Sequence, residues 1–257
     1  MISTLDDLSY FGDMKRVPKE IYYIGNKELL KRPKVSIVGS RKALLYTKDS
    51  VKEIANELAK RGVVVVSGAA MGVDLMAHIG AGVENTIAVM GNGLDIRYPA
   101  VNERVIEAIE NEGLVISSFP ISQKPTNWSF VVRNEIVVAL GEVLIVAEAD
   151  IKSGSMHSVE YAKKMKKSIY VLPHRLGQSS GTQKLLANKE AKAIYNIEEF
   201  ANRFGKPLPK SIELDEFYIF CQKRPTLNEA VAIYGERVYE EELEGNIVIE
   251  NGIVKMA

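Results

Sequence analysis

The sequence predicts an α/β fold with a doubly wound, mainly parallel β-sheet. Short runs rich in Val and Ile alternate with stretches of helical period from residue 34 onward. These runs are apolar throughout, which is typical of parallel strands that helices cover on both faces. Small, polar loops follow several of the runs, as they do where a strand leads into a helix. Together these observations favour repeated βα units.

The elements can be assigned in order along the chain. We predict strands at residues 35–38, 63–66, 86–90, 114–117, 142–147 and 168–172. We predict helices at residues 47–61, from Val73 onward and at residues 101–111, and an amphipathic helix before each of the last two strands. A shorter final unit is expected at residues 193–203.

Composition shifts divide the chain into four predicted segments. They are an N-terminal extension (1–33), the sheet domain (34–204), a linker (205–213) and a small C-terminal domain (214–257). The linker contains two prolines and a glycine, which disfavour regular structure. In the C-terminal segment, helical patterns at 215–222 and 227–234 precede a hairpin around Asn251-Gly252, which predicts a winged-helix-like module.

Charge and cysteine content limit the class of protein. The chain has 33 basic and 33 acidic residues, but residues 210–257 have five basic and ten acidic residues, a net charge of −5. The remainder is therefore mildly basic, which suits a local phosphate site better than a general DNA coat. A single cysteine and the absence of a signal peptide or of an apolar run of ~18 residues predict a cytoplasmic protein without membrane contact.

The loops after the predicted strands carry the candidate binding residues. In an open parallel sheet these loops meet at one edge, where ligands bind against helix N-termini. The candidates are Gly39, Ser40, Arg41, Ser67, Gly68, Phe130, Arg133, Asn134, Ser153, Gly154 and Ser155. No Gly-x-Gly-x-x-Gly or P-loop motif occurs, and the three histidines do not form a metal-ligand spacing with Cys221. We therefore expect no cofactor and no metal.

Several residues have two interpretations. Asp74 and His78 lie four apart on one predicted helix, and we favour a role in orienting the loop or capping the helix over an acid–base pair. His157 and Glu160 are interpreted as a solvated helix surface, and Cys221 as a buried small residue. Phe130 and Trp128 suit either core packing or base stacking.

Five motifs in order resemble the DNA-processing protein A (DprA, also called Smf) family. They are Val35–Arg41, Ser67–Asp74 with Ala77-His78, Gly93–Asp95 with Tyr98-Pro99, Phe130 with Arg133-Asn134, and Ser153–Ser155. The resemblance covers about residues 17–203. It implies an extended Rossmann-like fold, a homodimer, sequence-independent binding of single-stranded DNA, and loading of the RecA recombinase in natural transformation, without enzymatic activity. Gly39, Ser40 and Arg41 match the family's phosphate-binding loop, and Phe130 matches a DNA contact.

The sequence departs from the family at Glu135, His157-Ser158 and Gln183, and the family's N-terminal SAM-like domain is expected to be absent. A rival hypothesis is a nucleotide phosphoribohydrolase similar to the LOG family, whose glutamate would be Glu160; most of that family's glycine signature is missing at residues 152–160. A third interpretation, a nucleotide-sensing module that does not bind DNA, is left open by the loops alone.

Overall fold

The computed structural model describes residues 2–207 and 216–256. The chain forms two compact units, Met1–Leu208 and Pro209–Ala257. Residues 208–213, most of the predicted linker, lie outside the described residues.

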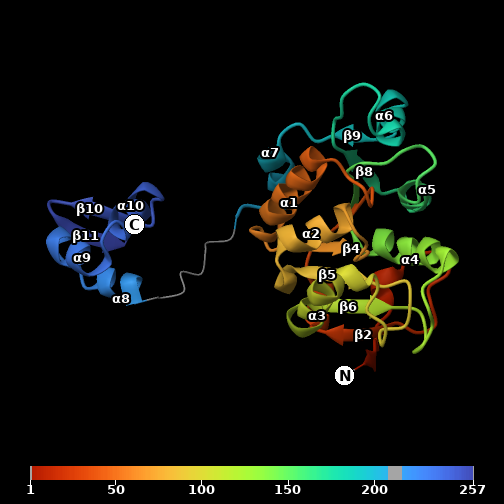
Figure 1. Cartoon of the computed structure of the whole chain (residues 1–257), viewed down its shortest axis with the longest axis horizontal. Coiled ribbons are helices and arrows are strands. Elements are labelled where there is room, and N and C mark those ends of the chain that lie inside the picture. The colour runs from red at the N-terminus through yellow and green to blue at the C-terminus, as the bar shows by residue number, and fades with distance from the viewer. Residues whose placement is uncertain (1, 208–215, 257) are drawn as a thin grey trace. The chain divides into compact units, whose positions relative to one another are not determined.

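A nine-stranded sheet runs through the first unit in the order β1-β2-β6-β5-β4-β3-β7-β8-β9 (Figure 1). The strands are β1 (Ser3–Thr4), β2 (Tyr22–Gly25), β3 (Lys34–Val38), β4 (Val64–Ser67), β5 (Thr86–Val89), β6 (Leu114–Ser117), β7 (Val143–Val146), β8 (Ser168–Val171) and β9 (Lys192–Ala193). From β3 the chain adds β4, β5 and β6 on one side, then returns to place β7, β8 and β9 on the other. The strand order therefore reverses between β3 and β7, where ligands bind in doubly wound folds.

The helices confirm the α/β class and cover both faces of this sheet. They are α1 (Leu45–Ala59), α2 (Val73–Ala81), α3 (Glu103–Glu112), α4 (Asn127–Leu140), α5 (Ser155–Lys164), α6 (Ser180–Ala187) and α7 (Ile197–Ala201). Short 3₁₀ helices are η1 (Ser9–Phe11), η2 (Lys27–Lys31), η3 (Val83–Asn85), η4 (Ala100–Asn102) and η5 (Asn202–Phe204). The sheet strands and helices predicted by range are confirmed to within two residues.

Side chains along each strand point alternately to the two faces of the sheet, and both faces are covered by helices. This explains why the strand sequences are apolar throughout. Val64 and Val66 pack in one core with α4 and α5, whereas Val63 and Val65 pack in a second core with α1, α2 and α7. Successive side chains of a strand point to opposite faces, so both sets must be apolar when helices cover both faces.

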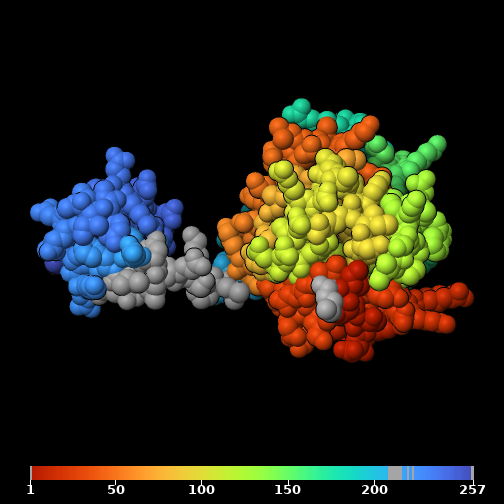
Figure 2. All heavy atoms as spheres, turned by 60° about the horizontal axis from the view of Figure 1, so that its bottom comes forward, coloured from red at the N-terminus to blue at the C-terminus, as the bar shows by residue number. Residues whose placement is uncertain are grey.

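The N-terminal segment is part of the first unit. Strand β2 pairs antiparallel with β6, and β1 pairs antiparallel with β2, so this segment extends one edge of the otherwise parallel sheet. Phe11 and Ile21 are fully buried in the core that contains α4. Figure 2 shows this red segment lying directly against the body of the unit. Residues 1–33 thus contribute to the sheet and its core.

Within residues 216–256, the second unit has three helices followed by a hairpin. They are α8 (Glu216–Gln222), α9 (Leu227–Tyr234), α10 (Arg237–Leu243), β10 (Ile247–Glu250) and β11 (Ile253–Met256), with β10 and β11 antiparallel. The predicted helix at 227–234 and the hairpin are present, whereas α10 was not predicted. Cys221 is buried in the core of this unit with Phe217 and Val254, as expected. The winged-helix assignment remains a prediction.

Candidate functional site

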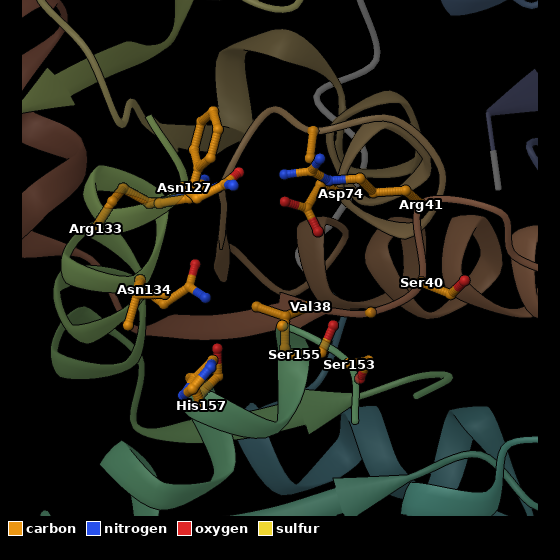
Figure 3. Close-up of a pocket in the computed structure, with 16 residues that line it drawn as sticks. Val38, Ser40, Arg41, Asp74, Asn127, Arg133, Asn134, Ser153, Ser155 and His157 are labelled. Atoms are coloured by element: carbon orange, nitrogen blue, oxygen red, sulfur yellow. The ribbon is translucent and has the colours of Figure 1, made fainter. Parts of the chain in front are cut away.

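One pocket of the first unit lies where β3 and β7 end side by side. It has a volume of about 470 Å³. Four segments line it: Val38–Arg41 after β3, Ala70 and Asp74 around the start of α2, five residues of α4 (Asn127, Phe130, Val131, Arg133, Asn134), and Ser153–Ser155 with His157 and Ser158 (Figure 3). The pocket therefore occupies the reversal point of the sheet, where ligands bind in doubly wound folds.

The loop after β3 is held by backbone hydrogen bonds to its neighbours. The Ser40 N–H donates to the Glu148 carbonyl oxygen (2.8 Å), and the Ser40 carbonyl accepts from the Val73 N–H (3.1 Å). A Cβ on Gly39 would lie 2.6 Å from Cγ2 of Val73, so glycine allows the loop to approach α2. The Ser40 hydroxyl accepts from the Lys42 N–H (3.1 Å) and points away from the other labelled side chains (Figure 3). Ser40 thus shapes the loop more than it supplies a free hydroxyl.

Arg133 brings a buried cation into the pocket from α4. The helix begins with a capping box in which Thr126 Oγ1 accepts from the Ser129 N–H and Ser129 Oγ accepts from the Thr126 N–H. Arg133, one turn later, is only 4% exposed, and its Nη1 donates to the Val89 carbonyl (2.9 Å). Burial lowers the pKa of Arg133, and Asp74 opposes that change. The Nε–H of this side chain has no partner among the described residues.

Asp74 faces the two arginines from the start of α2. Burial raises the pKa of its carboxyl group, while Arg133, the backbone N–H groups of Gly68 and Ala70, and Arg41 act in the opposite direction. In Figure 3, Arg41 and Arg133 extend toward the site from opposite sides, with the Asp74 carboxylate near Arg41. The acid therefore offsets part of the positive charge and leaves net positive charge for a ligand.

Phe130 supports both guanidinium groups. Arg41 lies 5.3 Å and Arg133 lies 5.9 Å from the centre of the ring. The half-buried ring also stacks on Tyr98, with centroids 5.7 Å apart and an interplanar angle of 25°. Such cation–π contacts favour the observed positions of the charges. Trp128 is 66% exposed, contacts Phe119 and does not line the pocket.

Unpartnered buried polar atoms concentrate at this site. Within residues 2–207 and 216–256, four buried side-chain polar atoms lack a hydrogen bond, and three belong to pocket residues: Arg133 Nε, Ser153 Oγ and Ser158 Oγ. Buried polar groups are nearly always paired in folded proteins. Each of these three groups can donate, and Arg133 Nε can only donate. The pocket is thus arranged for a ligand that accepts hydrogen bonds, such as a phosphate.

The structure brings together nine of the eleven predicted site residues. They are Gly39, Ser40, Arg41, Phe130, Arg133, Asn134, Ser153, Gly154 and Ser155. Gly68 borders a smaller adjoining pocket that also contains Arg133. Ser67 does not line either pocket: its hydroxyl is buried and donates to the Ile37 carbonyl across the sheet (2.7 Å). The hydroxyl of Ser67, the last residue of β4, is thus used within the sheet, so we no longer assign Ser67 to the site.

Seven other residues that line the pocket were not predicted as site residues from the sequence: Val38, Ala70, Asp74, Asn127, Val131, His157 and Ser158. His157 was interpreted as solvated helix surface, and it is exposed, but it borders the pocket. The available signal was helical spacing, because residues three and four positions after Gly154 share its face of α5. Glu160 lies in a different groove and is paired with Lys163 (3.4 Å).

His78 orients the loop before α2, as favoured from the sequence. Its Nε2 accepts from the Ala69 N–H (3.2 Å), so Nδ1 carries the proton and donates to Thr86 Oγ1 (2.6 Å). Thr86 in turn donates to the Val65 carbonyl (2.8 Å). Burial lowers the pKa of His78 to about 3. The imidazole is therefore neutral and fully engaged, which leaves no acid–base pair with Asp74.

Comparison with known proteins agrees with this fold. The sequence profile of the family described as DNA recombination-mediator protein A matches residues 4–205. The chain belongs to this family. It is 38% identical to the DNA processing protein DprA of Streptococcus pneumoniae over 210 residues, which is 79% of this chain and 73% of that protein. It is 34% identical to the protein Smf of Synechocystis over 66% of this chain but only 45% of that protein.

Solved structures of family members have the same architecture. DNA processing protein A of Helicobacter pylori, described for its mode of binding single-stranded DNA, is 41% identical, with a TM-score of 0.77 over 79% of this chain and 95% of that one. The DprA structure from Streptococcus pneumoniae is 32% identical, with a TM-score of 0.72 over 81% of this chain and 75% of that one. The extended Rossmann-like fold predicted from the family resemblance is therefore confirmed. No helix within the described residues has the length and apolarity to span a membrane.

Proposed function

We propose that the pocket at the β3–β7 reversal point binds the phosphate backbone of single-stranded DNA without sequence preference. The observation that carries this proposal is the set of three buried donors without a partner, Arg133 Nε, Ser153 Oγ and Ser158 Oγ, beside the exposed cation of Arg41. Guanidinium groups and hydroxyls hold phosphates and leave base edges unread. The H. pylori relative, described for single-stranded DNA binding, supports the same ligand class.

Two further parts of the proposal rest on family membership. They are the formation of a homodimer and the loading of the RecA recombinase onto the bound strand during natural transformation and recombination. The acidic second unit, with its net charge of −5 from residue 210 onward, is better suited to contact a protein than to read DNA. We also infer a binding protein rather than an enzyme.

The rival phosphoribohydrolase hypothesis gains no support from the pocket. The glutamate that it requires, Glu160, is exposed, forms an ion pair with Lys163 and lies in the groove between α5 and α6. A hydrolase glutamate must reach the ligand that the site holds. Incubation with nucleoside monophosphates is expected to release no free base, and release that Glu160→Gln abolishes would establish the enzyme.

A salt series of DNA binding tests the function directly. Affinity for oligo-dT and for mixed-sequence single strands should be similar and should exceed affinity for duplex. The logarithm of the affinity should fall linearly with the logarithm of the salt concentration, with a slope (the salt slope) of ~0.7 per phosphate contact. Nucleoside monophosphates should compete weakly, because one nucleotide cannot make contacts along a strand. Duplex or mononucleotide competing as well as single strand would contradict the proposal.

A further inference from the structure

The positive charge of the first unit is concentrated in one stretch of the sequence. Residues 151–192, which contain α5, β8 and α6, have nine basic and two acidic residues, a net charge of +7. Residues 1–209 as a whole carry only +5, so the rest of this part of the chain is slightly acidic. Charge clustered in this way attracts a polyanion to one part of a molecule. Here that part contains α5 and α6.

A groove between these two helices, the α5–α6 groove, has a volume of about 550 Å³. Three lysines line it from three segments: Lys152 on the loop after β7, Lys163 on α5 and Lys184 on α6. Ile151, which is 50% exposed, and Met156 add apolar surface. A groove of this kind can follow a phosphate backbone with its cations and offer apolar surface to the bases.

Two of the three lysines are available to a ligand. Lys163 pairs with Glu160 (3.4 Å) and with Glu190 (3.1 Å), and both glutamates also line the groove. Lys152 and Lys184 are exposed and form no ion pair with any residue in 2–207 or 216–256. A phosphate can therefore bind these two ammonium groups without breaking an ion pair.

The groove adjoins the phosphate pocket at Ser153 and His157. Both residues line the pocket as well as the groove, and Figure 3 shows them on the α5 side of the pocket. Ser153 Oγ is buried and has no hydrogen-bond partner among the described residues. A hydroxyl in this state can donate to a phosphate oxygen at the junction. A ligand that continues from the pocket past Ser153 thus enters the groove.

We propose that the α5–α6 groove holds the next nucleotides of the single strand whose phosphate occupies the pocket, an inference that rests on the proposed function. Lys152 and Lys184 bind phosphates of this stretch, while its bases pack against Ile151 and Met156. Ammonium groups and aliphatic side chains read no base edges, so the groove adds affinity without sequence preference. A strand occupies pocket and groove as one molecule, which favours it over an acidic protein segment.

The test is the binding of two lengths of oligo-dT to the full chain. A strand of about 3 nucleotides fills little more than the pocket, whereas one of about 20 also covers the groove. The double variant Lys152→Gln with Lys184→Gln loses two phosphate contacts, so its salt slope for the long strand should be shallower by about 1.4. At ~0.1 M salt this change corresponds to an affinity about 25-fold lower. Affinity for the short strand should stay within about twofold, because salt screens distant charges.

A second double variant, Lys15→Gln with Lys52→Gln, is the matched control. It removes the same charge from two exposed lysines that line neither the pocket nor the groove. It should bind both lengths as wild type does. Melting temperatures of both double variants should equal that of wild type, because all four side chains are exposed.

The possible outcomes separate the inference from the proposed function. A loss that the control reproduces, a loss that affects both lengths equally, or an unchanged salt slope would overturn the inference alone. If the short strand binds too weakly to measure, the comparison of the two double variants on the long strand decides. An acidic peptide of equal charge that displaces the long strand as well as unlabelled oligo-dT does would assign the groove to a protein ligand instead. Wild-type protein that binds neither length would contradict the proposed function.

Discussion

The guanidinium group of Arg133 lies across the backbone of Gly68. A Cβ on Gly68 would lie 1.5 Å from Arg133 Nη1 and 2.3 Å from its Cζ. The Arg133 side chain is also buried and bonded to the Val89 carbonyl, so it cannot move aside without losing that bond. The absence of a side chain at residue 68 is therefore what allows the buried cation to occupy the pocket.

Gly68→Ala should displace Arg133 and damage both stability and binding. Overpacking in a filled interior typically costs ~1–3 kcal/mol, and we expect a loss of that size in the free energy of unfolding. Affinity for single-stranded DNA should fall as well. Gly154→Ala is the matched control for stability, because a Cβ there meets nothing within 4 Å and its backbone is helical. Equal stability of the two variants in denaturant titrations would contradict this relationship.

The positions of the strands and the composition of the site loops were predictable because both depend on local sequence. Val63–Val66 is an unbroken β-branched run, which favours a strand covered on both faces. Gly39 to Arg41 follow a second short strand that is apolar except for Ser36. The addition of β2 to the edge of the sheet was not predictable from the sequence. Tyr22–Gly25 is short, ends in glycine and pairs with a strand about 90 residues away along the chain. The direction of the Ser67 hydroxyl and the burial of Arg133 depend on tertiary packing, which sequence spacing does not reveal.

Arg41→Ala should weaken DNA binding without affecting stability. The side chain is exposed and makes its described contact with the Phe130 ring, so its removal leaves no cavity. Loss of a charge-assisted phosphate contact costs ~1–3 kcal/mol of binding free energy. The slope of log affinity against log salt concentration should become shallower by about 0.7, the value for one phosphate contact. Lys42→Ala removes an adjacent exposed cation outside the pocket and should cause a smaller loss. Unchanged affinity in folded Arg41→Ala would remove Arg41 from the site.

His78 should make the protein less stable in acid. Its pKa is lowered to about 3 in the folded state, below the ~6.5 of an unfolded chain, so the unfolded state binds more protons between these values. The stability it contributes is present above pH ~6.5 and is lost as pH falls, by at most ~1.4 kcal/mol per pH unit. Comparison of unfolding free energies at pH 7 and pH 5 should show a smaller fall in His78→Gln than in His157→Gln. An NMR titration of the His78 imidazole near pH ~6.5, the value of a free imidazole, would show that the ring is not held as described.

A shortened chain that ends at Pro207 should fold and still bind single-stranded DNA. The boundary at 208 separates two compact units, and the pocket is built entirely from the first. Phe204 packs on Phe200 with centroids 5.6 Å apart, so the end point should lie beyond it. Affinity and salt slope should match those of the full chain. A folded short chain that has lost DNA binding would show that the acidic second unit takes part.

Phe130→Ala distinguishes a ring that stacks on a base from a ring that holds the two arginines. The half-buried ring stacks on Tyr98 and lies beneath Arg41 and Arg133. Its removal should lower the free energy of unfolding by less than the ~3–5 kcal/mol typical of a fully buried Phe. It should also lower both DNA affinity and the salt slope, because Arg41 loses its support.

Base stacking alone makes a different prediction for the same residue. Removal of a stacking ring costs ~1–3 kcal/mol of affinity while leaving the salt slope and the melting temperature unchanged. Phe130→Leu keeps apolar volume beneath the arginines but removes the aromatic face that both base stacking and the cation–π contacts need. It therefore limits the loss of stability and leaves the salt dependence of binding as the measurement that separates the two roles. Trp128→Ala controls for an exposed aromatic outside the pocket and should bind normally. If Phe130→Ala reduces affinity at an unchanged salt slope and melting temperature, the ring meets a base directly, and the support of Arg41 is secondary.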